Sequence, residues 1–338
     1  MPTDKDRPKI LVVGSFVKDL IVSTRKFPGQ GETVLGCGFQ MATGGKGANQ
    51  AIQAARLGAQ VTMVGKVGDD DFGKELINAC LRDGIDCSRV MTDRQTPSSV
   101  GNVQLQVDEN GATQNRIIVV PGANMSITLE EVAFLEREIA QYDMVLLQLE
   151  IPLEVNRRVM EYARRSGVPV MLNTAPADGA SRKLISGLTY VASNESEAEA
   201  LTGAPIRFQS GSVDLDSVRA AVERFLEMGV QNVLITLGGA GAAFGNRREF
   251  FLIPAVDGVV SVDPTGAGDS FIGAFSTFVS AGADHRAAVR MANYVGSLTV
   301  SVLGAQTSLP SLEQINRLIQ ERGETELLFL PEKLTRCG

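Results

Sequence analysis

From about Thr128 onward the sequence alternates between short β-branched runs and amphipathic segments, and this alternation restricts the possible folds most strongly. Met144 to Leu147 and Val168 to Leu172 look like buried strands, each followed by polar or helical sequence, and Val233 to Thr236 repeats the strand pattern. Strands that alternate with helices predict a mostly parallel sheet with helices on both faces. We therefore expect a three-layer α/β/α sandwich.

Two stretches depart from this pattern and predict a second, smaller sheet. Residues 26–45 are rich in glycine and lack helical periodicity. Residues 100–120 alternate, and Asp108-Glu109-Asn110-Gly111 interrupts them with a strong hairpin signal. We expect a single domain over residues 1–338, with an antiparallel β lid from about 16–45 and 97–121. Residues 324–338 are expected to form a loosely attached tail.

Composition excludes several classes of protein. The chain has 338 residues and a net charge of −7, so broad attraction to nucleic acid or to an anionic membrane surface is not expected. The N-terminus is polar and four scattered cysteines show no C-x-x-C spacing, which favours a reduced cytoplasmic protein. His285 is the single histidine, so a histidine-based triad or a multi-histidine metal centre is excluded.

The stretch from Asp263 to Asp269, Asp-Pro-Thr-Gly-Ala-Gly-Asp, has the organisation of an anion-binding turn. A valine-rich run precedes it and an apolar segment follows, which predicts a strand, a glycine turn and a helix start. Unpaired N–H groups and the positive end of the helix dipole attract an anion there. A carboxylate beside that anion is unfavourable unless it accepts a proton. Asp269 is therefore either a general base that faces a phosphate or a simple helix cap.

A second glycine-rich turn runs from Gly44 to Gln50 and opens an alanine-rich helix. It lacks the upstream glycine and the Ser or Thr of a Walker A loop, and no G-x-G-x-x-G follows a strand. Open α/β sheets bind ligands beyond the carboxyl ends of their strands. The polar residues expected at those ends, which predict the rim of a site, are Glu150, Asn173, Asn194, Thr236 and Asp263.

Together these motifs resemble the ribokinase family, the PfkB-type carbohydrate kinases. The match covers roughly residues 9–320 and is carried in the family's order by Gly44–Gln50, Asn194–Glu199 and Asp263–Asp269, with support from Gln148–Glu150, Ile235–Gly238 and Gly304–Gln306. The resemblance implies an α/β sandwich with a β lid. It also implies transfer of the γ-phosphoryl group of ATP, bound with Mg²⁺, to a sugar hydroxymethyl group, foremost O5 of D-ribose.

The resemblance further implies a role for individual residues. Asp269 looks like the catalytic base, and the anion hole is matched by Gly266, Ala267 and Gly268. Sugar-side positions are matched by Asp19, Gly45, Lys46, Asn49 and Glu150. Nucleotide-side positions, which would bind ATP, are matched by Asn194, Thr236, Gly238, Gly241, Gly268 and Asn293. A loop for a monovalent cation, K⁺ above all, is matched by Asp263, Thr265, Thr299, Val302, Gly304 and Ser308.

The identity of the sugar stays open at this point. Val17 stands two residues before Asp19, where the family typically has an asparagine that can bond a sugar hydroxyl. Either this position tolerates an apolar residue, or the preferred sugar lacks or moves one hydroxyl, as 2-deoxyribose does. Other pentose or ketohexose kinases remain alternatives, and so does a catalytically silent sugar or nucleotide sensor. The resemblance also implies a homodimer formed through the lid.

Overall fold

We describe the fold from a computed structural model, over residues 7–107, 113–177, 181–209 and 212–328. Its centre is a nine-stranded sheet with the strand order β15-β14-β13-β10-β9-β8-β1-β4-β5. Every pair is parallel except β13 with β14 and β14 with β15. The strands are β1 (Lys9–Val13), β4 (Gln60–Gly68), β5 (Asp86–Asp93), β8 (Met144–Leu147), β9 (Val170–Asn173), β10 (Tyr190–Asn194), β13 (Asn232–Thr236), β14 (Ala242–Asn246) and β15 (Phe250–Ile253).

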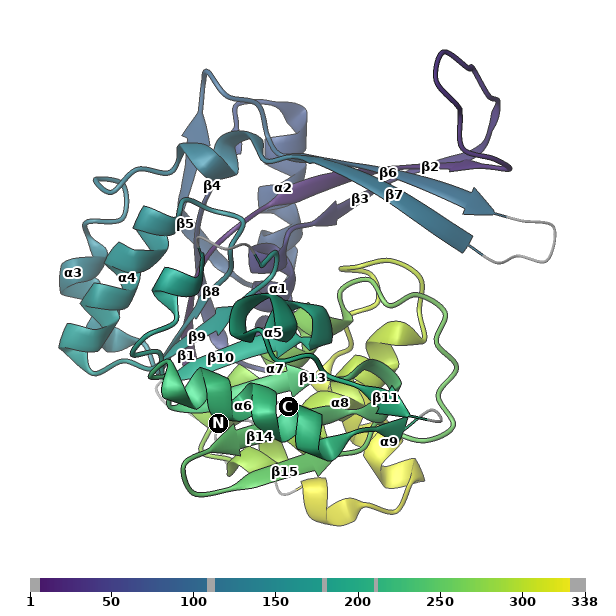
Figure 1. The fold of residues 1–338 in the computed structure, drawn as a ribbon. Helices are drawn as coiled ribbons and strands as arrows, with labels where there is room; N and C mark the ends of the chain where they lie inside the picture. Colours follow the sequence, from purple (N-terminus) through teal and green to yellow (C-terminus); the bar gives the residue numbers. More distant parts are fainter. Residues whose placement is uncertain (1–6, 108–112, 178–180, 210–211, 329–338) are drawn as a thin grey trace.

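Helices cover both faces of this sheet, which confirms the three-layer prediction (Figure 1). Successive residues of a strand point to opposite faces. Ile10 and Val12 therefore pack into one core while Leu11 and Val13 pack into the other. The first core includes α1 (Lys46–Arg56), α2 (Asp71–Arg82), α7 (Ala267–Ser280), α8 (His285–Val300) and α9 (Leu312–Glu321). The second includes α3 (Leu135–Glu138), α4 (Leu153–Ser166), α5 (Glu195–Thr202) and α6 (Leu215–Glu227).

Local sequence signals explain where several helices begin. Asp70 accepts a hydrogen bond from the Gly73 N–H at 2.7 Å and so caps α2. Asp284 caps α8 in the same way. Two helices begin instead at glycines with positive φ, α1 after Gly45 and α7 after Gly266. As glycines, these N-cap residues have no side chain of their own to cap the helix, and both helix starts lie at the predicted site.

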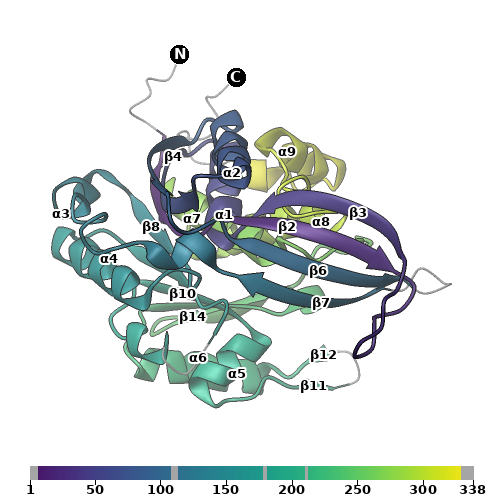
Figure 2. The same ribbon diagram turned by 90° about the horizontal axis from the view of Figure 1, so that it is seen from above.

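The lid is a separate four-stranded sheet that projects from the body (Figures 1 and 2). Its order is β3-β2-β6-β7, with antiparallel pairs at both edges and a parallel pair, β2 with β6, in the middle. The strands are β2 (Val17–Thr24), β3 (Gly36–Gly44), β6 (Val100–Val107) and β7 (Thr113–Val120). The predicted hairpin joins β6 to β7, and its turn, residues 108–112, lies outside the described residues.

The two faces of the lid differ. Asp19 on β2 pairs with Ala42 on β3 and with Gly101 on β6. We call the face of the lid that carries the Asp19 side chain the substrate face. Lys18 points the opposite way, toward the outer face. Its Nζ lies 2.5 Å from a Glu75 carboxylate oxygen and 6.0 Å from the centroid of the Phe72 ring, both on α2. The base of the outer face therefore packs against α2.

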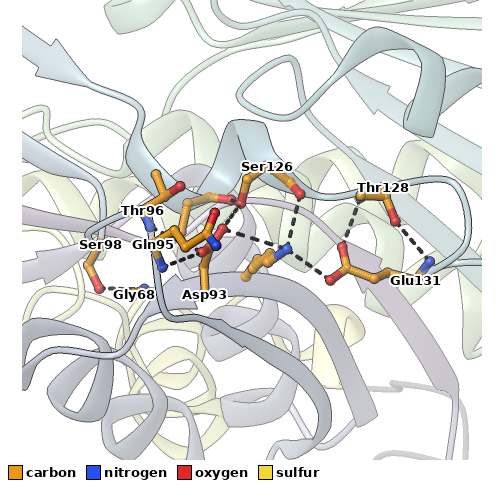
Figure 3. Close-up of polar contacts among 10 residues, drawn as sticks. Gly68, Asp93, Gln95, Thr96, Ser98, Ser126, Thr128 and Glu131 are labelled. Atoms are coloured by element: carbon orange, nitrogen blue, oxygen red, sulfur yellow. Dashed lines mark hydrogen bonds and ion pairs between the residues drawn. The ribbon is translucent and has the colours of Figure 1, made fainter.

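The lid strands leave the body beside a partly buried ionic cluster at the carboxyl ends of β4 and β5 (Figure 3). Lys66 donates to a Glu131 carboxylate at 2.8 Å and to the Ser126 carbonyl at 3.1 Å. Asp93 lies 3.7 Å from the same ammonium. Hydrogen bonds from the Ser126 hydroxyl and the N–H groups of Gln95 and Thr96 hold the pKa of Asp93 well below its usual range. The cluster fixes the start of the loop that leads into β6.

The structure differs from the sequence analysis at two places. Residues 324–328 are not a loose tail, because Leu327 is 8% exposed and Arg290 forms ion pairs with Glu324 and Glu326 at 2.5 and 3.0 Å. The predicted tail beyond residue 328 lies outside the described residues. The antiparallel strands β14 and β15 were also not predicted. They extend the sheet without an intervening helix, so the alternating pattern does not reveal them.

The remaining elements are short. They are η2 (Gly122–Ser126), η3 (Ile139–Gln141), η4 (Ser181–Leu184), η5 (Gly238–Ala240), η6 (Thr325–Leu328), β11 (Phe208–Gln209) and β12 (Ser212–Val213). Over the described part of the chain, no helix has both the length and the apolar character needed to cross a membrane.

Candidate active site

The turn before α7 has the geometry of an anion-binding loop. Gly266 adopts φ 79°, and the Ala267 N–H donates to the Pro264 carbonyl at 3.2 Å. A Cβ built on Gly268 would meet nothing within 4 Å, so the backbone here is open to a ligand. First-turn N–H groups have no partner within their own helix. With Ala267 already bonded, the N–H groups of Gly268 and Asp269 are the donors best placed for an anion.

Asp269 does not cap α7, so the simple capping alternative is wrong. Its side chain is 7% exposed and receives amide hydrogen bonds on both oxygens. Asn49 donates to Oδ2 at 2.9 Å, while Gln50 and Asn173 donate to Oδ1 at 3.1 and 3.4 Å. Asn173 was predicted at the rim of the site from its place after a strand, whereas Gln50 was not predicted as a site residue. Gln50 ends the glycine-rich motif, and this position was the signal that could have identified it.

Asp269 lies in a cavity of about 210 Å³ at the carboxyl edge of the large sheet. The cavity brings together sequence-predicted residues from distant segments, namely Lys46, Asn194, Thr236, Gly266, Gly268 and Asp269. Thr236 and Gly268 also line a second cavity of about 610 Å³. That cavity contains the other predicted nucleotide-side residues, Gly238, Gly241 and Asn293. The two cavities therefore adjoin, and the larger has room for a nucleoside next to the smaller one.

Two of the residues predicted on the nucleotide side, both asparagines, also have structural partners. Asn194 caps α5 by accepting from the Glu197 N–H at 2.8 Å, in a reciprocal capping box. The Asn293 amide donates to the carbonyls of Ile253 and Pro254 at 3.1 and 2.9 Å. Each residue therefore orders a wall of its cavity. Glu197, which the sequence reasoning missed, also lines the Asp269 cavity.

The residues predicted on the sugar side meet where the lid joins the body. Cβ atoms built on Gly44 and Gly101 would lie 2.7 and 2.2 Å from the carboxylate oxygens of Asp19, so these glycines leave room for that side chain. Burial, and then the charge of Glu150, raise the pKa of Asp19 to about 6. Glu150 accepts from the Ser15 hydroxyl at 2.5 Å and from the Lys46 N–H at 3.1 Å. Glu150 therefore also caps the start of α1.

Lys46 is the cation of this anionic site. Burial acts to lower the pKa of Lys46, but the charges of Asp269, Glu150 and Glu197 together raise it. The ammonium therefore stays charged beside the open end of α7. Gly45 precedes it at φ 96°, and a Cβ there would lie 2.7 Å from backbone atoms of Phe16 and Val17. Only glycine permits this close approach of α1 to the base of the lid.

The predicted cation loop is assembled around Asp263. Its Oδ1 accepts from the Thr265 N–H and its Oδ2 from the Gly304 N–H, both at 2.9 Å. Burial opposes ionisation of Asp263, but these hydrogen bonds lower its pKa overall. The Thr299 hydroxyl donates to the Ser270 hydroxyl at 2.9 Å, and Ser308 donates to the Ala305 carbonyl at 2.8 Å. Val302, the remaining predicted ligand, is 46% exposed.

Comparisons with known proteins agree with this geometry. Residues 7–312 match the model of the family described as pfkB family carbohydrate kinase. The chain is 37% identical to ribokinase of Bacillus subtilis over 310 residues, covering 92% of this chain and 99% of that protein. It is 34% identical to deoxyribokinase of Salmonella typhimurium over 314 residues, covering 92% and 98%.

Its fold also resembles a solved structure of Arabidopsis thaliana ribokinase complexed with ribose and ATP. That similarity has a TM-score of 0.83 and 31% identity, over 93% of this chain and 99% of the plant chain. The family match, the full-length relatives and the carboxylate beside an open helix start lead to one conclusion. The chain belongs to the pfkB family of carbohydrate kinases and is a sugar kinase, a phosphotransferase with an alcohol group as acceptor.

Proposed function

We propose that this kinase transfers the γ-phosphoryl group of ATP to O5 of D-ribose, with Asp269 as general base. The observation that carries the proposal is the Asp269 carboxylate, buried yet bordering the cavity at the open N-terminus of α7. A carboxylate held there can accept the proton of a sugar hydroxyl, and the adjacent N–H groups can bind the phosphoryl group. The named relatives and the ribose-bound neighbour support ribose as the acceptor.

The arrangement suits the transition state of phosphoryl transfer. That transition state is loose, so the protein mainly has to align the reactants and stabilise charge on the transferring group. The N–H groups of Gly268 and Asp269 and the ammonium of Lys46 are fixed before reaction, and preorganised donors need no reorganisation when charge develops. The hydroxyl proton passes to an Asp269 oxygen as the new oxygen–phosphorus bond forms.

The sugar would bind between the body and the substrate face of the lid. There Asp19 offers two carboxylate oxygens to vicinal hydroxyls, and Asn49 has a buried Oδ1 with no partner in the described part of the chain. A sugar hydroxyl that donates to this oxygen would remove the penalty of leaving it unpaired. 2-Deoxyribose remains the alternative acceptor sugar, because Val17 offers no polar atom beside Asp19.

Two ions would accompany the reaction. Glu197 lines the cavity around Asp269, and Glu150 acts electrostatically on Lys46, which lines it too. Such hard oxygen donors fit Mg²⁺, which binds phosphates and carboxylates largely through water. Magnesium bound with ATP would supply charge neutralisation on the phosphates. The loop formed by Asp263, Thr265 and residues 299–308 offers only oxygen ligands, which suits a monovalent cation such as K⁺. Its position beside Gly266 would stiffen the anion-binding turn.

A coupled assay of ADP release tests the proposal, with D-ribose, 2-deoxyribose, D-fructose and adenosine as acceptors, each with and without K⁺. We expect ribose-dependent turnover that increases with K⁺. Asp269→Asn should reduce kcat by about 10² or more, because the base is lost while the binding sites stay. If wild-type protein binds ATP but phosphorylates none of the acceptors, the chain is a sensor and the proposal is wrong. A higher kcat/KM for 2-deoxyribose than for ribose would make 2-deoxyribose the proposed acceptor.

A further inference from the structure

The carboxylate of Asp269 is the end of a buried chain of amide hydrogen bonds. Gln50 Nε2 donates to Asp269 Oδ1 at 3.1 Å, and Gln148 Nε2 donates to Gln50 Oε1 at 2.8 Å. Gln50 lies on α1, and Gln148 follows β8 directly. Both glutamines are completely buried, at 0% exposure. The chain connects the proposed base, on α7, to the end of a central strand.

The direction of these hydrogen bonds follows from the chemistry of the carboxylate. An ionised carboxylate only accepts, so Gln50 must present its NH₂ group to Asp269 and its carbonyl oxygen to Gln148. Gln148 must then present its own NH₂ group to Gln50. Its remaining oxygen, Oε1, is buried without a hydrogen-bond partner among the described residues. An unpaired buried oxygen is destabilising, so this arrangement is not the one that maximises stability.

We propose that Gln148 is a positioning residue, which acts through Gln50 to hold the Asp269 carboxylate in its reactive orientation. The inference rests on the proposed role of Asp269 as base. Without Gln148, the Gln50 amide is free to turn its oxygen toward Asp269, where two acceptors repel each other and the carboxylate rotates away. Gln148 is two residues from Glu150, which caps α1 through Lys46 N–H. The same segment therefore orders both the sugar side of the site and the base.

A substitution of Gln148 distinguishes a positioning role from a packing role, because the two roles predict different effects on kcat. If Gln148 only fills space, an apolar side chain of similar length leaves kcat intact, and removal of an unpaired polar oxygen leaves the protein at least as stable. If Gln148 positions Asp269, the same substitution lowers kcat and leaves substrate binding unchanged, because neither glutamine lines the cavity around Asp269. Small misplacements of a reacting group reduce rate by up to about 10².

The test is a double-mutant cycle between Gln148→Met and Asp269→Asn, with turnover measured by transfer of radiolabelled phosphate from ATP to ribose at high enzyme concentration. We expect Gln148→Met to lower kcat by roughly 10- to 100-fold and to change KM for ribose and for ATP by less than about twofold. In the Asp269→Asn background the same substitution should cause no further loss, because two residues that act as one unit are not additive.

Gln53→Met is the matched control. Gln53 is also buried on α1, but its amide donates to the Pro310 carbonyl at 3.0 Å and not to Asp269. We expect Gln53→Met to keep kcat within about twofold of wild type. Gln50→Met carries the same expectation as Gln148→Met, so the proposal stays testable if Gln148→Met does not fold.

Each outcome is decisive. A wild-type kcat in Gln148→Met, or equal losses from Gln148→Met with and without Asp269, overturns the positioning role and leaves the proposed function intact. Undiminished turnover in Asp269→Asn alone overturns the proposed function itself. A kcat loss in Gln148→Met that disappears in the Asp269→Asn background supports both.

Discussion

Asp19 is the residue whose ionisation should govern sugar binding. Burial and the neighbouring Glu150 raise the pKa of Asp19 to about 6, so the carboxyl is protonated below that pH and charged above it. A protonated carboxyl loses part of its capacity to accept from sugar hydroxyls. We expect kcat/KM for ribose to be constant above about pH 6 and to fall toward tenfold per pH unit below it.

Measurement of kcat/KM for ribose between pH 5 and 8, at saturating ATP, checks this expectation. Asp19→Asn serves as the control, because its kcat/KM should be low at every pH and should not change around pH 6. A wild-type profile that stays flat down to pH 5 would show that the charge of Asp19 does not contribute to sugar binding.

Val17 is the residue whose substitution should change the choice of sugar. It is 6% exposed and lies on the substrate face two residues from Asp19. A Cβ added at Gly101 would lie 3.5 Å from a methyl group of Val17, so the two residues are neighbours. An apolar side chain here discriminates weakly between ribose and 2-deoxyribose. Val17→Asn adds an amide, and one hydrogen bond of about 1 kcal/mol should favour ribose by roughly five- to tenfold.

The ratio of kcat/KM values for ribose and 2-deoxyribose is the relevant measurement, since it cancels any general loss of activity. Val17→Leu, which stays apolar, should leave the ratio near its wild-type value. An unchanged ratio in Val17→Asn would mean that this side chain does not face the 2-hydroxyl.

At the scale of elements, a single asparagine fastens η2 to the start of the lid. Asn124 is 1% exposed, accepts from the Phe16 N–H at 3.0 Å and donates to the Phe16 carbonyl at 2.7 Å. Asn124→Ala leaves both buried backbone groups without these partners. We expect the free energy of unfolding to fall by about 2–4 kcal/mol, because each unsatisfied buried group costs about 1–3 kcal/mol.

Urea denaturation of Asn124→Ala measures this loss. Asn115→Ala, on an exposed stretch of β7, is the matched control and should unfold at the wild-type midpoint. Coincident midpoints for the two variants would show that other contacts hold the lid base without Asn124. The remaining candidates are the Lys18–Glu75 ion pair and the cluster around Lys66.

The elements also show what a sequence can and cannot reveal. The helix starts at Gly45 and Gly266 were predictable because a glycine turn between an extended run and a small-residue segment is a local signal. The contact of Gln50 with Asp269 was not, because 219 residues separate the partners and no local pattern encodes their meeting. In the same way, the cap that Glu150 forms on α1 spans 104 residues. The motifs predicted which segments form the walls of the site. Only the fold shows which side chains of these segments hydrogen-bond to one another.

For the whole molecule, the lid is the surface that should join two copies of this chain. Apolar side chains that are at least half exposed lie on both faces of the lid: Phe39, Met41, Ile118 and Val120 on the outer face, and Ile117 and Val119 on the substrate face. On the outer face, the row from Met41 through Leu20 and Asn102 to Ile118 crosses all four strands. Only the base of this face packs on α2. An exposed face that gathers several large apolar side chains is typical of a protein–protein interface.

Ile118→Asp should therefore convert a dimer into a monomer, because an unpaired carboxylate in the centre of an apolar interface is strongly unfavourable. Sedimentation velocity over a range of protein concentrations measures the change. Ile117→Asp is the matched control, since the neighbouring residue points to the substrate face, and this variant should stay dimeric while its KM for ribose increases. A wild-type protein that sediments as a monomer would exclude the lid interface altogether. Dissociation by Ile117→Asp alone would move the interface to the substrate face and place part of the partner beside the sugar.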